Sequence, residues 1–250
     1  MGWALLSLGP AMLENQEGKR VPEVTFRFIE DGRWVERSTA DLFAGKTVVV
    51  FALPGAFTPT CSTAHVPRYA ELREAFAAKG VDDVLCMSVN DGFVMDAWQK
   101  DQGVQGITFV PDGNGEFAKG LGMLVDKQAL GFGPRSWRYS MLVRDGVIEK
   151  MFIEPDEPGD PFEVSDADTM MRHLDAGYQS EPDVFILTKP GCGHCARAKS
   201  MLREKGLRFA EVTASPKMLR AVSKSTFTPQ VFVDGKLVGG ADQLAEYLAG

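Results

Sequence analysis

Cysteine and long apolar runs are both scarce in this sequence. Its 250 residues include only four cysteines, Cys61, Cys86, Cys192 and Cys195. A secreted chain of this length that relied on disulfide bonds would carry more, so we expect a reducing, cytoplasmic environment with thiols kept for chemistry. No apolar run approaches the roughly 18 residues needed to span a bilayer. The first dozen residues lack the basic start and the cleavage site of a signal peptide.

Positive charge is also in short supply. The 27 Lys and Arg residues are outnumbered by 34 Asp and Glu, which gives a formal net charge of -7 and a pI near 5.1. No overall basic field is available to hold nucleic acid or an anionic membrane, so we expect neither as a partner. Apolar residues make up 44% of the chain, enough for well-packed cores in one large domain or two smaller ones.

Residues 18–175 carry the pattern of an α/β domain that follows a short N-terminal extension, residues 1–17. Asp-Gly pairs at 31–32 and 145–146 each separate two strand-like runs, as in β-hairpins. Apolar side chains at three-to-four spacing predict an amphipathic helix over 66–80, with Pro67 opening its main body or kinking it. The other expected elements are strands at 46–53, 84–91 and 107–113 and helices at 92–101 and 165–174.

Residues 183–250 carry the pattern of a second, smaller α/β domain, joined to the first by an expected linker at 176–182. This part holds 10 Lys and Arg against 6 Asp and Glu, a net charge of +4, whereas residues 1–182 hold 17 against 28, or -11. The two parts therefore have opposite sign. The expected elements are strands at 184–188 and 207–212, helices at 195–206, 216–223 and 241–249, and a hairpin at 230–240.

Cys61 closes the stretch PGAFTPTC, just where the first long helix is expected to begin. A thiol is a weak nucleophile until it ionises, and a helix N-terminus, a nearby cation or a hydrogen bond to the sulfur favours the thiolate. Thr58 can place a hydroxyl beside the sulfur, and Pro54 and Pro59 stiffen the loop. Cys86 lies in an expected apolar strand, where a small hydrophobic residue is the ordinary interpretation. His65 is interpreted as structural, on the helix surface or against a loop.

The pattern Pro54-x-x-x-Thr58-x-x-Cys61 resembles the active-site loop of peroxiredoxins, in particular the type II (Prx5) subgroup, and the resemblance extends over roughly residues 18–175. It implies that Cys61 is the thiol that peroxide oxidises, that Pro54 shields it and that Thr58 hydrogen-bonds the sulfur and the peroxide. It also implies an arginine before an aromatic residue at a strand start. Arg138 fits that position, and Arg135 is the rival.

The sequence departs from the two-cysteine scheme of many such enzymes. Those enzymes carry a resolving cysteine after the segment that corresponds to 153–156, whereas the stretch EPDEPGDPFEVSD contains none. The oxidised form of Cys61 must then be reduced by another thiol.

Cys192 and Cys195 form a C-x-x-C pair at an expected strand-to-helix junction, a pattern typical of redox-active dithiols. Zinc would need about four ligands, and no second pair of this kind exists, so we expect no metal. The letters CGHC alone resemble protein disulfide isomerase sites, but TKPGCGHC, TPQVFVDG and GGADQL together resemble a glutaredoxin over 183–250. That family usually reads CPYC, so Gly193 and His194 are departures.

Glutathione, the co-substrate that this second resemblance implies, brings two carboxylates that need donors. Lys189 can meet one, and backbone N–H groups at the start of the last helix can meet the other. Thr228-Pro229 resembles the segment whose cis-proline pairs with the tripeptide backbone. The expected glutathione-binding residues are Lys189, Cys192, Thr228, Pro229, Gly240, Ala241 and Asp242.

The two halves together resemble the bacterial hybrid peroxiredoxin–glutaredoxin family, which implies two thioredoxin-fold domains in tandem. The expected activity is glutathione-dependent reduction of hydrogen peroxide and alkyl hydroperoxides, with Cys192 resolving glutathionylated Cys61. We expect no tightly bound cofactor and a homo-oligomer, dimer or tetramer. The alternatives left open are a redox sensor that oxidises client proteins, a chaperone-like assembly, and a disulfide oxidoreductase whose active site is the CGHC motif.

Overall fold

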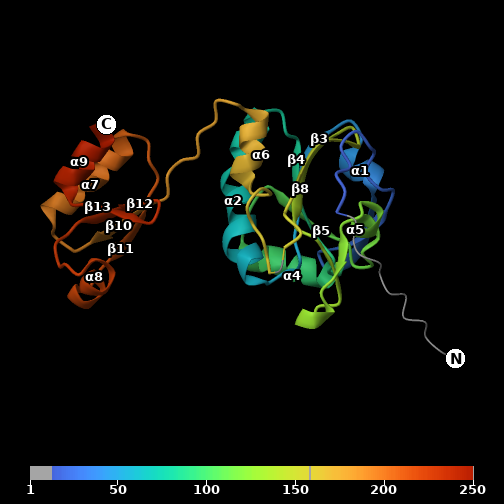
Figure 1. The fold of residues 1–250 in the computed structure, drawn as a ribbon, viewed down its shortest axis with the longest axis horizontal. Helices are drawn as coiled ribbons and strands as arrows, with labels where there is room; N and C mark the ends of the chain where they lie inside the picture. Colours follow the sequence, from blue (N-terminus) through green and yellow to red (C-terminus); the bar gives the residue numbers. More distant parts are fainter. Residues whose placement is uncertain (1–12, 158, 250) are drawn as a thin grey trace. The chain divides into compact units, whose positions relative to one another are not determined.

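The computed structural model describes residues 13–157 and 159–249, and the chain divides into two compact units, Met1–Tyr178 and Gln179–Gly250 (Figure 1). Most of the predicted N-terminal extension, residues 1–12, lies outside the described residues. Its remainder packs with the first unit, where Glu17 accepts a hydrogen bond from the backbone N–H of Met151 at 2.9 Å. In the predicted linker, the Tyr178 hydroxyl donates to Asp168 at 2.7 Å, so the chain is held to the first unit as far as Tyr178.

A five-stranded sheet forms the centre of the first unit. Its strands follow the order β5-β4-β3-β8-β9, in which β3, β4 and β5 run parallel and β8 and β9 are antiparallel neighbours. Because both faces of the sheet are covered, β3 is a continuous apolar run with alternate side chains in two different cores. The strands are β3 (Thr47–Ala52), β4 (Asp83–Ser88), β5 (Ile107–Pro111), β8 (Tyr139–Arg144) and β9 (Val147–Ile153).

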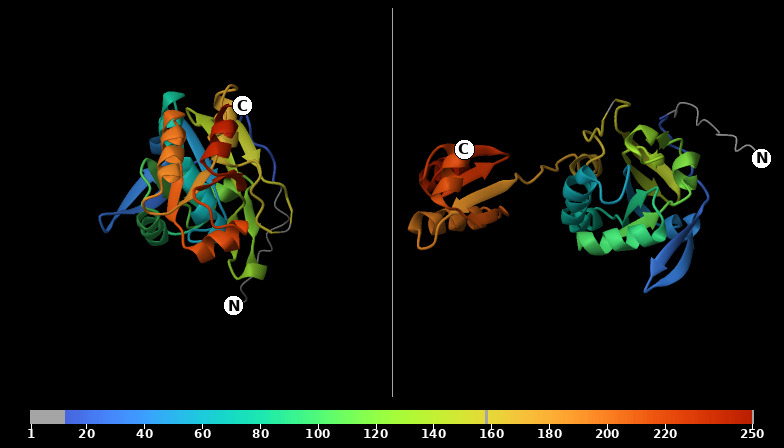
Figure 2. Two further views of the ribbon diagram at one scale, coloured as in Figure 1. Left: turned by 90° about the vertical axis from the view of Figure 1, so that its left-hand side faces the viewer. Right: turned by 90° about the horizontal axis from the view of Figure 1, so that it is seen from below.

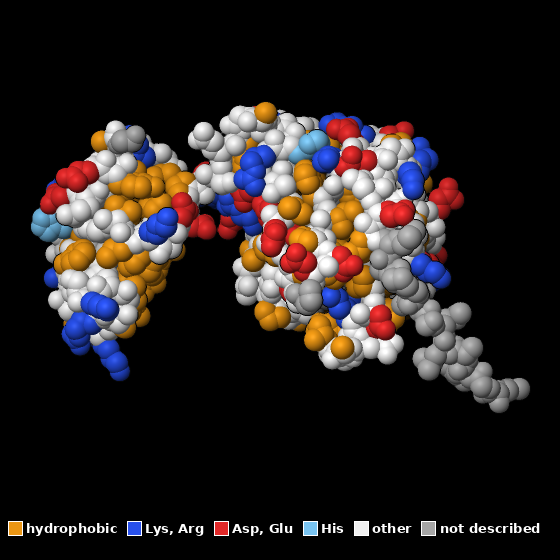
Figure 3. Space-filling model, viewed as in Figure 1, with side chains coloured by type: hydrophobic (Ala, Val, Ile, Leu, Met, Phe, Trp, Pro, Cys, Tyr) orange, Lys and Arg blue, Asp and Glu red, His pale blue; other side chains and the backbone are white. Residues whose placement is uncertain are grey.

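Helices cover both faces of this sheet (Figure 1). One face packs against α1 (Thr39–Phe43) and α5 (Glu116–Gly120), through Phe43 and Phe117. The opposite face packs against four helices, α2 (Val66–Glu71), α3 (Arg73–Ala78), α4 (Gly92–Gln102) and α6 (Ala167–Leu174). The expected acidic surplus of this unit lies at its surface, and Figure 3 shows Asp and Glu side chains spread over the face that it pictures.

The Asp-Gly turns are confirmed as hairpin turns. Asp31 and Gly32, between β1 (Thr25–Glu30) and β2 (Arg33–Ser38), both have positive φ, as the two-residue turn requires. The turn between β8 and β9 repeats this geometry at Asp145 and Gly146. Figure 2 shows the tip of the β1–β2 hairpin reaching beyond the rest of the first unit.

The helix expected over 66–80 is divided. A π-helical turn, η1 (Cys61–His65), precedes α2, and a break at Leu72 separates α2 from α3. Leu72 still donates to the carbonyl of Arg68 and accepts from Phe76, so the apolar spacing continues through the break. The sequence analysis also missed five short elements, because segments of three to five residues carry too little periodicity. They are α1, α5, β6 (Leu124–Asp126), the 3-10 turn η2 (Gln128–Leu130) and β7 (Pro134–Ser136).

The second unit is a four-stranded sheet with helices on both faces. Its order is β11-β10-β12-β13, with β10 and β11 parallel and the rest antiparallel. Helices α7 (Gly193–Glu204) and α9 (Ala241–Ala249) cover one face, and α8 (Pro216–Ser223) covers the other. The strands are β10 (Val184–Thr188), β11 (Ala210–Thr213), β12 (Gln230–Val233) and β13 (Lys236–Gly239). None of the helices in the described part of the chain has the length and apolar run that crossing a bilayer would require.

Gly92 offers a test of the packing between α4 and the β1–β2 hairpin. A Cβ at this position would lie 2.7 Å from the carbonyl oxygen of Arg27 and 3.3 Å from the backbone nitrogen of Ile29, atoms that cannot move independently of β1. We expect Gly92→Ala to lower the free energy of unfolding of the first unit by about 1–3 kcal/mol, measured by urea denaturation.

Gly193 supplies the matched control. It is also the first residue of its helix, but a Cβ there would meet nothing within 4 Å. Gly193→Ala should leave the stability of the second unit unchanged or slightly raised. Equal effects of the two substitutions, each on its own unit, would contradict the packing explanation.

Candidate active site

Cys61 lies at the start of the π-helical turn that follows β3, and its side chain is fully buried. The preceding loop is turned sharply, because Phe57 has a φ of 61°, a conformation that bulky residues rarely adopt. Pro54 is buried beneath this loop. The hydroxyl of Thr58 donates to the carbonyl of Gly55 at 2.8 Å, so its proton is engaged there and its lone pairs remain to accept.

Arg138, between β7 and β8, brings a positive charge to the Cys61 sulfur. Nη2 of Arg138 lies 3.6 Å from Sγ of Cys61, and the arginine side chain is only 1% exposed. A guanidinium does not lose its proton in proteins, so the charge is permanent. The rival, Arg135, instead donates from Nη1 to the carbonyls of Val89 and Pro134 at 3.2 and 3.0 Å.

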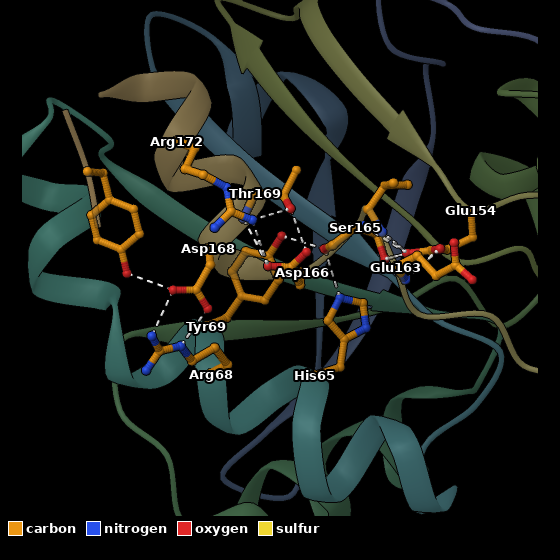
Figure 4. A network of polar contacts seen from close by, with 12 residues as sticks. His65, Arg68, Tyr69, Glu154, Glu163, Ser165, Asp166, Asp168, Thr169 and Arg172 are labelled. Atoms are coloured by element: carbon orange, nitrogen blue, oxygen red, sulfur yellow. Dashed lines mark hydrogen bonds and ion pairs between the residues drawn. The ribbon is translucent and has the colours of Figure 1, made fainter. Parts of the chain in front are cut away.

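His65 is not on the helix surface, as the sequence interpretation allowed, but is buried against Arg138. Nη1 of Arg138 donates to Nδ1 of His65 at 2.9 Å, and because arginine can only donate, Nδ1 must be the unprotonated nitrogen. Nε2–H then donates to the carbonyl of Ser165 at 3.2 Å (Figure 4). Burial, together with the charge of Arg138, lowers the pKa of His65 well below its ordinary value, so the ring is neutral. The spacing of four residues between Cys61 and His65 was the sequence feature that could have identified His65 as a site residue.

Glu154 is a second residue that the sequence did not single out. Its buried carboxylate accepts hydrogen bonds from the backbone N–H groups of Glu163, Val164 and Ser165 at 2.7–2.9 Å, and from the Ser165 hydroxyl at 2.6 Å. Its backbone N–H donates to the carbonyl of Arg138 at 3.1 Å. Glu154 therefore joins the segment that carries Arg138 to the far end of the loop 155–165. Figure 4 shows Glu154 beside Glu163 and Ser165.

Cys86, in the middle of β4, is buried in the same core as Cys61. Burial raises the pKa of the Cys86 thiol well above its ordinary value. Because the thiolate is the nucleophile, this cysteine is a poor one, in agreement with its interpretation as a small hydrophobic residue.

In the second unit, Cys192 and Cys195 are joined as a disulfide at the start of α7. Cys192 is the N-cap, and the backbone N–H of Cys195 donates to its sulfur at 3.1 Å. The hydroxyl of Thr228 lies 3.6 Å from the same sulfur, and the Thr228-Pro229 peptide bond is cis. Cys192 is partly exposed and Cys195 is buried, so an incoming thiol reaches Cys192 first.

The expected glutathione-binding residues come from segments that meet at one edge of this sheet. Leu187, near the end of β10, pairs with Gln230 at the start of β12, which places Lys189 near Thr228. At the start of α9, however, two of the expected glutathione-binding residues already have hydrogen-bond partners within the chain. The backbone N–H of Gly240 donates to the Gln243 side chain at 2.9 Å, and Arg197 donates to Asp242 at 2.7 Å.

Comparisons with known proteins identify both units. Residues 16–171 match the Redoxin family, and residues 184–238 match the Glutaredoxin family. The chain therefore belongs to the peroxiredoxins, specifically to those with a C-terminal glutaredoxin domain, and both units have the thioredoxin fold.

Individual relatives agree with this assignment. The chain is 57% identical over 241 residues to the hybrid peroxiredoxin hyPrx5 of Haemophilus influenzae, covering 95% of this chain and 100% of the relative. It is 56% identical to peroxiredoxin sll1621 of Synechocystis over 169 residues, covering 62% of this chain and 89% of that protein. The crystal structure of reduced Prx3 from Vibrio vulnificus in complex with H2O2 has a TM-score of 0.61 and 41% identity, covering 65% and 100% of the two chains.

The role of the hydrogen bond between His65 and Arg138 can be tested with substitutions of His65 that keep the contact of one ring nitrogen and remove that of the other. Asn offers an acceptor near Nδ1, whereas Gln offers a donor near Nε2 and Leu offers neither. If His65 orients Arg138, oxidation of Cys61 by hydrogen peroxide should slow roughly tenfold in His65→Leu and His65→Gln and stay near the original rate in His65→Asn. Stopped-flow tryptophan fluorescence measures this rate. Recovery with Gln but not Asn would show that only the Ser165 contact matters.

The buried, neutral state of His65 also predicts a pH dependence of stability. Below the ordinary histidine pKa of about 6.5, the unfolded chain binds a proton at this residue that the folded chain does not. The free energy of unfolding should therefore fall as the pH falls, by up to about 2 kcal/mol between pH 6.5 and 5. Urea denaturation at both pH values should show a smaller loss in His65→Asn. His173→Asn, on the exposed end of α6, is the control and should keep the original loss.

Proposed function

We propose that this chain is a glutathione-dependent thiol peroxidase that reduces hydrogen peroxide and alkyl hydroperoxides at Cys61. The observation that carries the proposal is the 3.6 Å contact between the buried Arg138 guanidinium and the Cys61 sulfur. A permanent positive charge favours the thiolate and then stabilises the negative charge that grows on the leaving oxygen. Arg138 therefore serves both the resting nucleophile and the transition state.

The first step is attack of the Cys61 thiolate on the nearer oxygen of ROOH. The O–O bond breaks, the peroxide proton passes to the leaving oxygen so that ROH departs, and Cys61 is left as a sulfenate that takes a proton from solvent to become the sulfenic acid. Nε–H of Arg138 is buried and has no hydrogen-bond partner among the described residues, so a peroxide oxygen would satisfy it. The Thr58 oxygen, with its lone pairs available, would accept a hydrogen bond from the peroxide O–H, and Pro54 would exclude water from the sulfur.

Resolution of the sulfenic acid falls to glutathione. The first unit has one other cysteine, Cys86, which is a poor nucleophile because burial raises its thiol pKa, and Cys192 and Cys195 belong to the second unit. Glutathione condenses with the sulfenic acid, which releases water and leaves a mixed disulfide on Cys61. Cys192 then attacks the glutathione sulfur, and Cys61 leaves as the thiolate. A second glutathione, or Cys195 followed by glutathione, regenerates Cys192 and yields GSSG.

The second unit would bind glutathione along the edge that holds Cys192. Lys189, which is exposed, would meet one carboxylate, and the cis Thr228-Pro229 segment would pair with the tripeptide backbone. The start of α9, at Gly240, Ala241 and Asp242, would receive the other carboxylate. The Gln243 and Arg197 side chains now on Gly240 and Asp242 would then exchange partners. We further propose a cytoplasmic homo-oligomer with no tightly bound cofactor.

Serine substitutions separate the two thiol sites. Cys61→Ser should abolish glutathione-dependent peroxide consumption, because it removes the atom that is oxidised. Cys192→Ser should stop turnover but leave one rapid oxidation per chain in stopped-flow fluorescence. Cys195→Ser should keep part or all of the turnover, since a monothiol route suffices.

Two results would contradict this scheme. Full turnover in Cys192→Ser would show that the second unit does not resolve Cys61. Slow turnover with glutathione, combined with fast disulfide formation in a client protein, would favour a redox sensor instead.

A further inference from the structure

The loop that leaves β9, residues 155–165, places a carboxylate on the reacting centre. Asp160 accepts from Nη2 of Arg138 at 2.5 Å, and this is the same nitrogen that contacts the Cys61 sulfur. The arginine side chain is 1% exposed, whereas the Asp160 side chain is 42% exposed. Asp160 therefore lies between the buried guanidinium and solvent.

Several features hold the described residues of this loop, 155–157 and 159–165, in place. Glu154 accepts four hydrogen bonds from residues 163–165 and so ties the far end of the loop to the end of β9. The ring of Phe162 packs on His65, with ring centroids 4.8 Å apart, and lies 5.4 Å from the Arg138 guanidinium carbon. Gly159 has a φ of 109°, a conformation that L side chains rarely adopt, and it turns the chain directly before Asp160.

Nε–H of Arg138 has no partner among the described residues, but the donors on Nη2, which face the Cys61 sulfur, are already shared. Of the five N–H groups of the guanidinium, Nη1 donates one to His65, and Nη2 faces both the Cys61 sulfur and Asp160. A peroxide that enters this site needs donors for the oxygen that leaves with negative charge. Asp160 occupies one of them and adds a second negative charge beside the thiolate, so it competes with the transition state for Arg138.

We propose that Asp160 is an electrostatic latch on Arg138, a positioning residue that must release the guanidinium before Cys61 reacts at full rate. The inference rests on the proposed peroxidase reaction and adds a control step to it. The groups that face Arg138 are the Cys61 sulfur and the Asp160 carboxylate, with the neutral His65 ring beside them. In the latched state Asp160 holds Nη2, and in the released state that N–H turns to the leaving oxygen.

The test compares Asp160→Asn with the original chain by stopped-flow fluorescence, using hydrogen peroxide and the reduced full-length protein. The second-order rate constant for oxidation of Cys61 should rise roughly twofold to fivefold, the size expected for a half-exposed ion pair. Asp156→Asn removes the same charge from an exposed position in the same loop and should leave the rate unchanged. Asp160→Glu, which keeps the carboxylate, should stay close to the original rate.

Salt distinguishes a latch from a merely structural role. Screening weakens an ion pair with an exposed partner, so added NaCl should accelerate the original chain toward the rate of Asp160→Asn and leave that variant unchanged. An unaltered or lower rate in Asp160→Asn would overturn the latch, because Asp160 would then be idle or would hold Arg138 in its reactive orientation. If Cys61 of the original chain does not react with peroxide, the proposed peroxidase function fails. If Cys61 reacts but Asp160→Asn is no faster, only the latch fails.

Discussion

A buried guanidinium is the constraint on which the active site of the first unit depends. Arg138 cannot lose its proton, and a charge taken out of water must be matched by acceptors in the protein. The structure supplies three, from the Cys61 sulfur, the His65 ring and the Asp160 carboxylate. The positive charge of Arg138 needs these acceptors for stability. The same charge favours the Cys61 thiolate and stabilises the negative charge on the leaving oxygen.

The acceptors come from parts of the chain that are far apart in sequence. Cys61 and His65 lie on one π-helical turn after β3, Arg138 lies directly before β8, and Asp160 follows β9. Since β8 lies between β3 and β9 in the sheet, the three segments meet at one edge. Glu154 then fixes the loop by pairing its carboxylate with backbone N–H groups, so the position of Asp160 depends on a residue that never touches Cys61.

The second unit repeats the fold but uses its thiol differently. Cys61 is fully buried beside a charged partner, whereas Cys192 is partly exposed at a helix N-terminus and paired with Cys195. A buried thiol that admits a small peroxide suits oxidation, and an exposed dithiol suits exchange with other thiols. This division fits the proposed cycle, in which the glutaredoxin domain supplies the resolving thiol that the first unit lacks.

Local sequence determined much of this protein. Asp-Gly pairs fixed the hairpins because their turns need positive φ, apolar runs marked the covered strands, and two short motifs marked Cys61 and Cys192. The sequence could not show that Leu72 breaks a helix or that Thr58 donates to Gly55, since spacing does not specify which hydrogen bond forms. Only the tertiary structure brings His65, Glu154 and Asp160 to the candidate site around Arg138. Their roles arise from contacts with Arg138 and with residues 163–165 that span 9 to 73 residues of chain, and such contacts leave no local pattern.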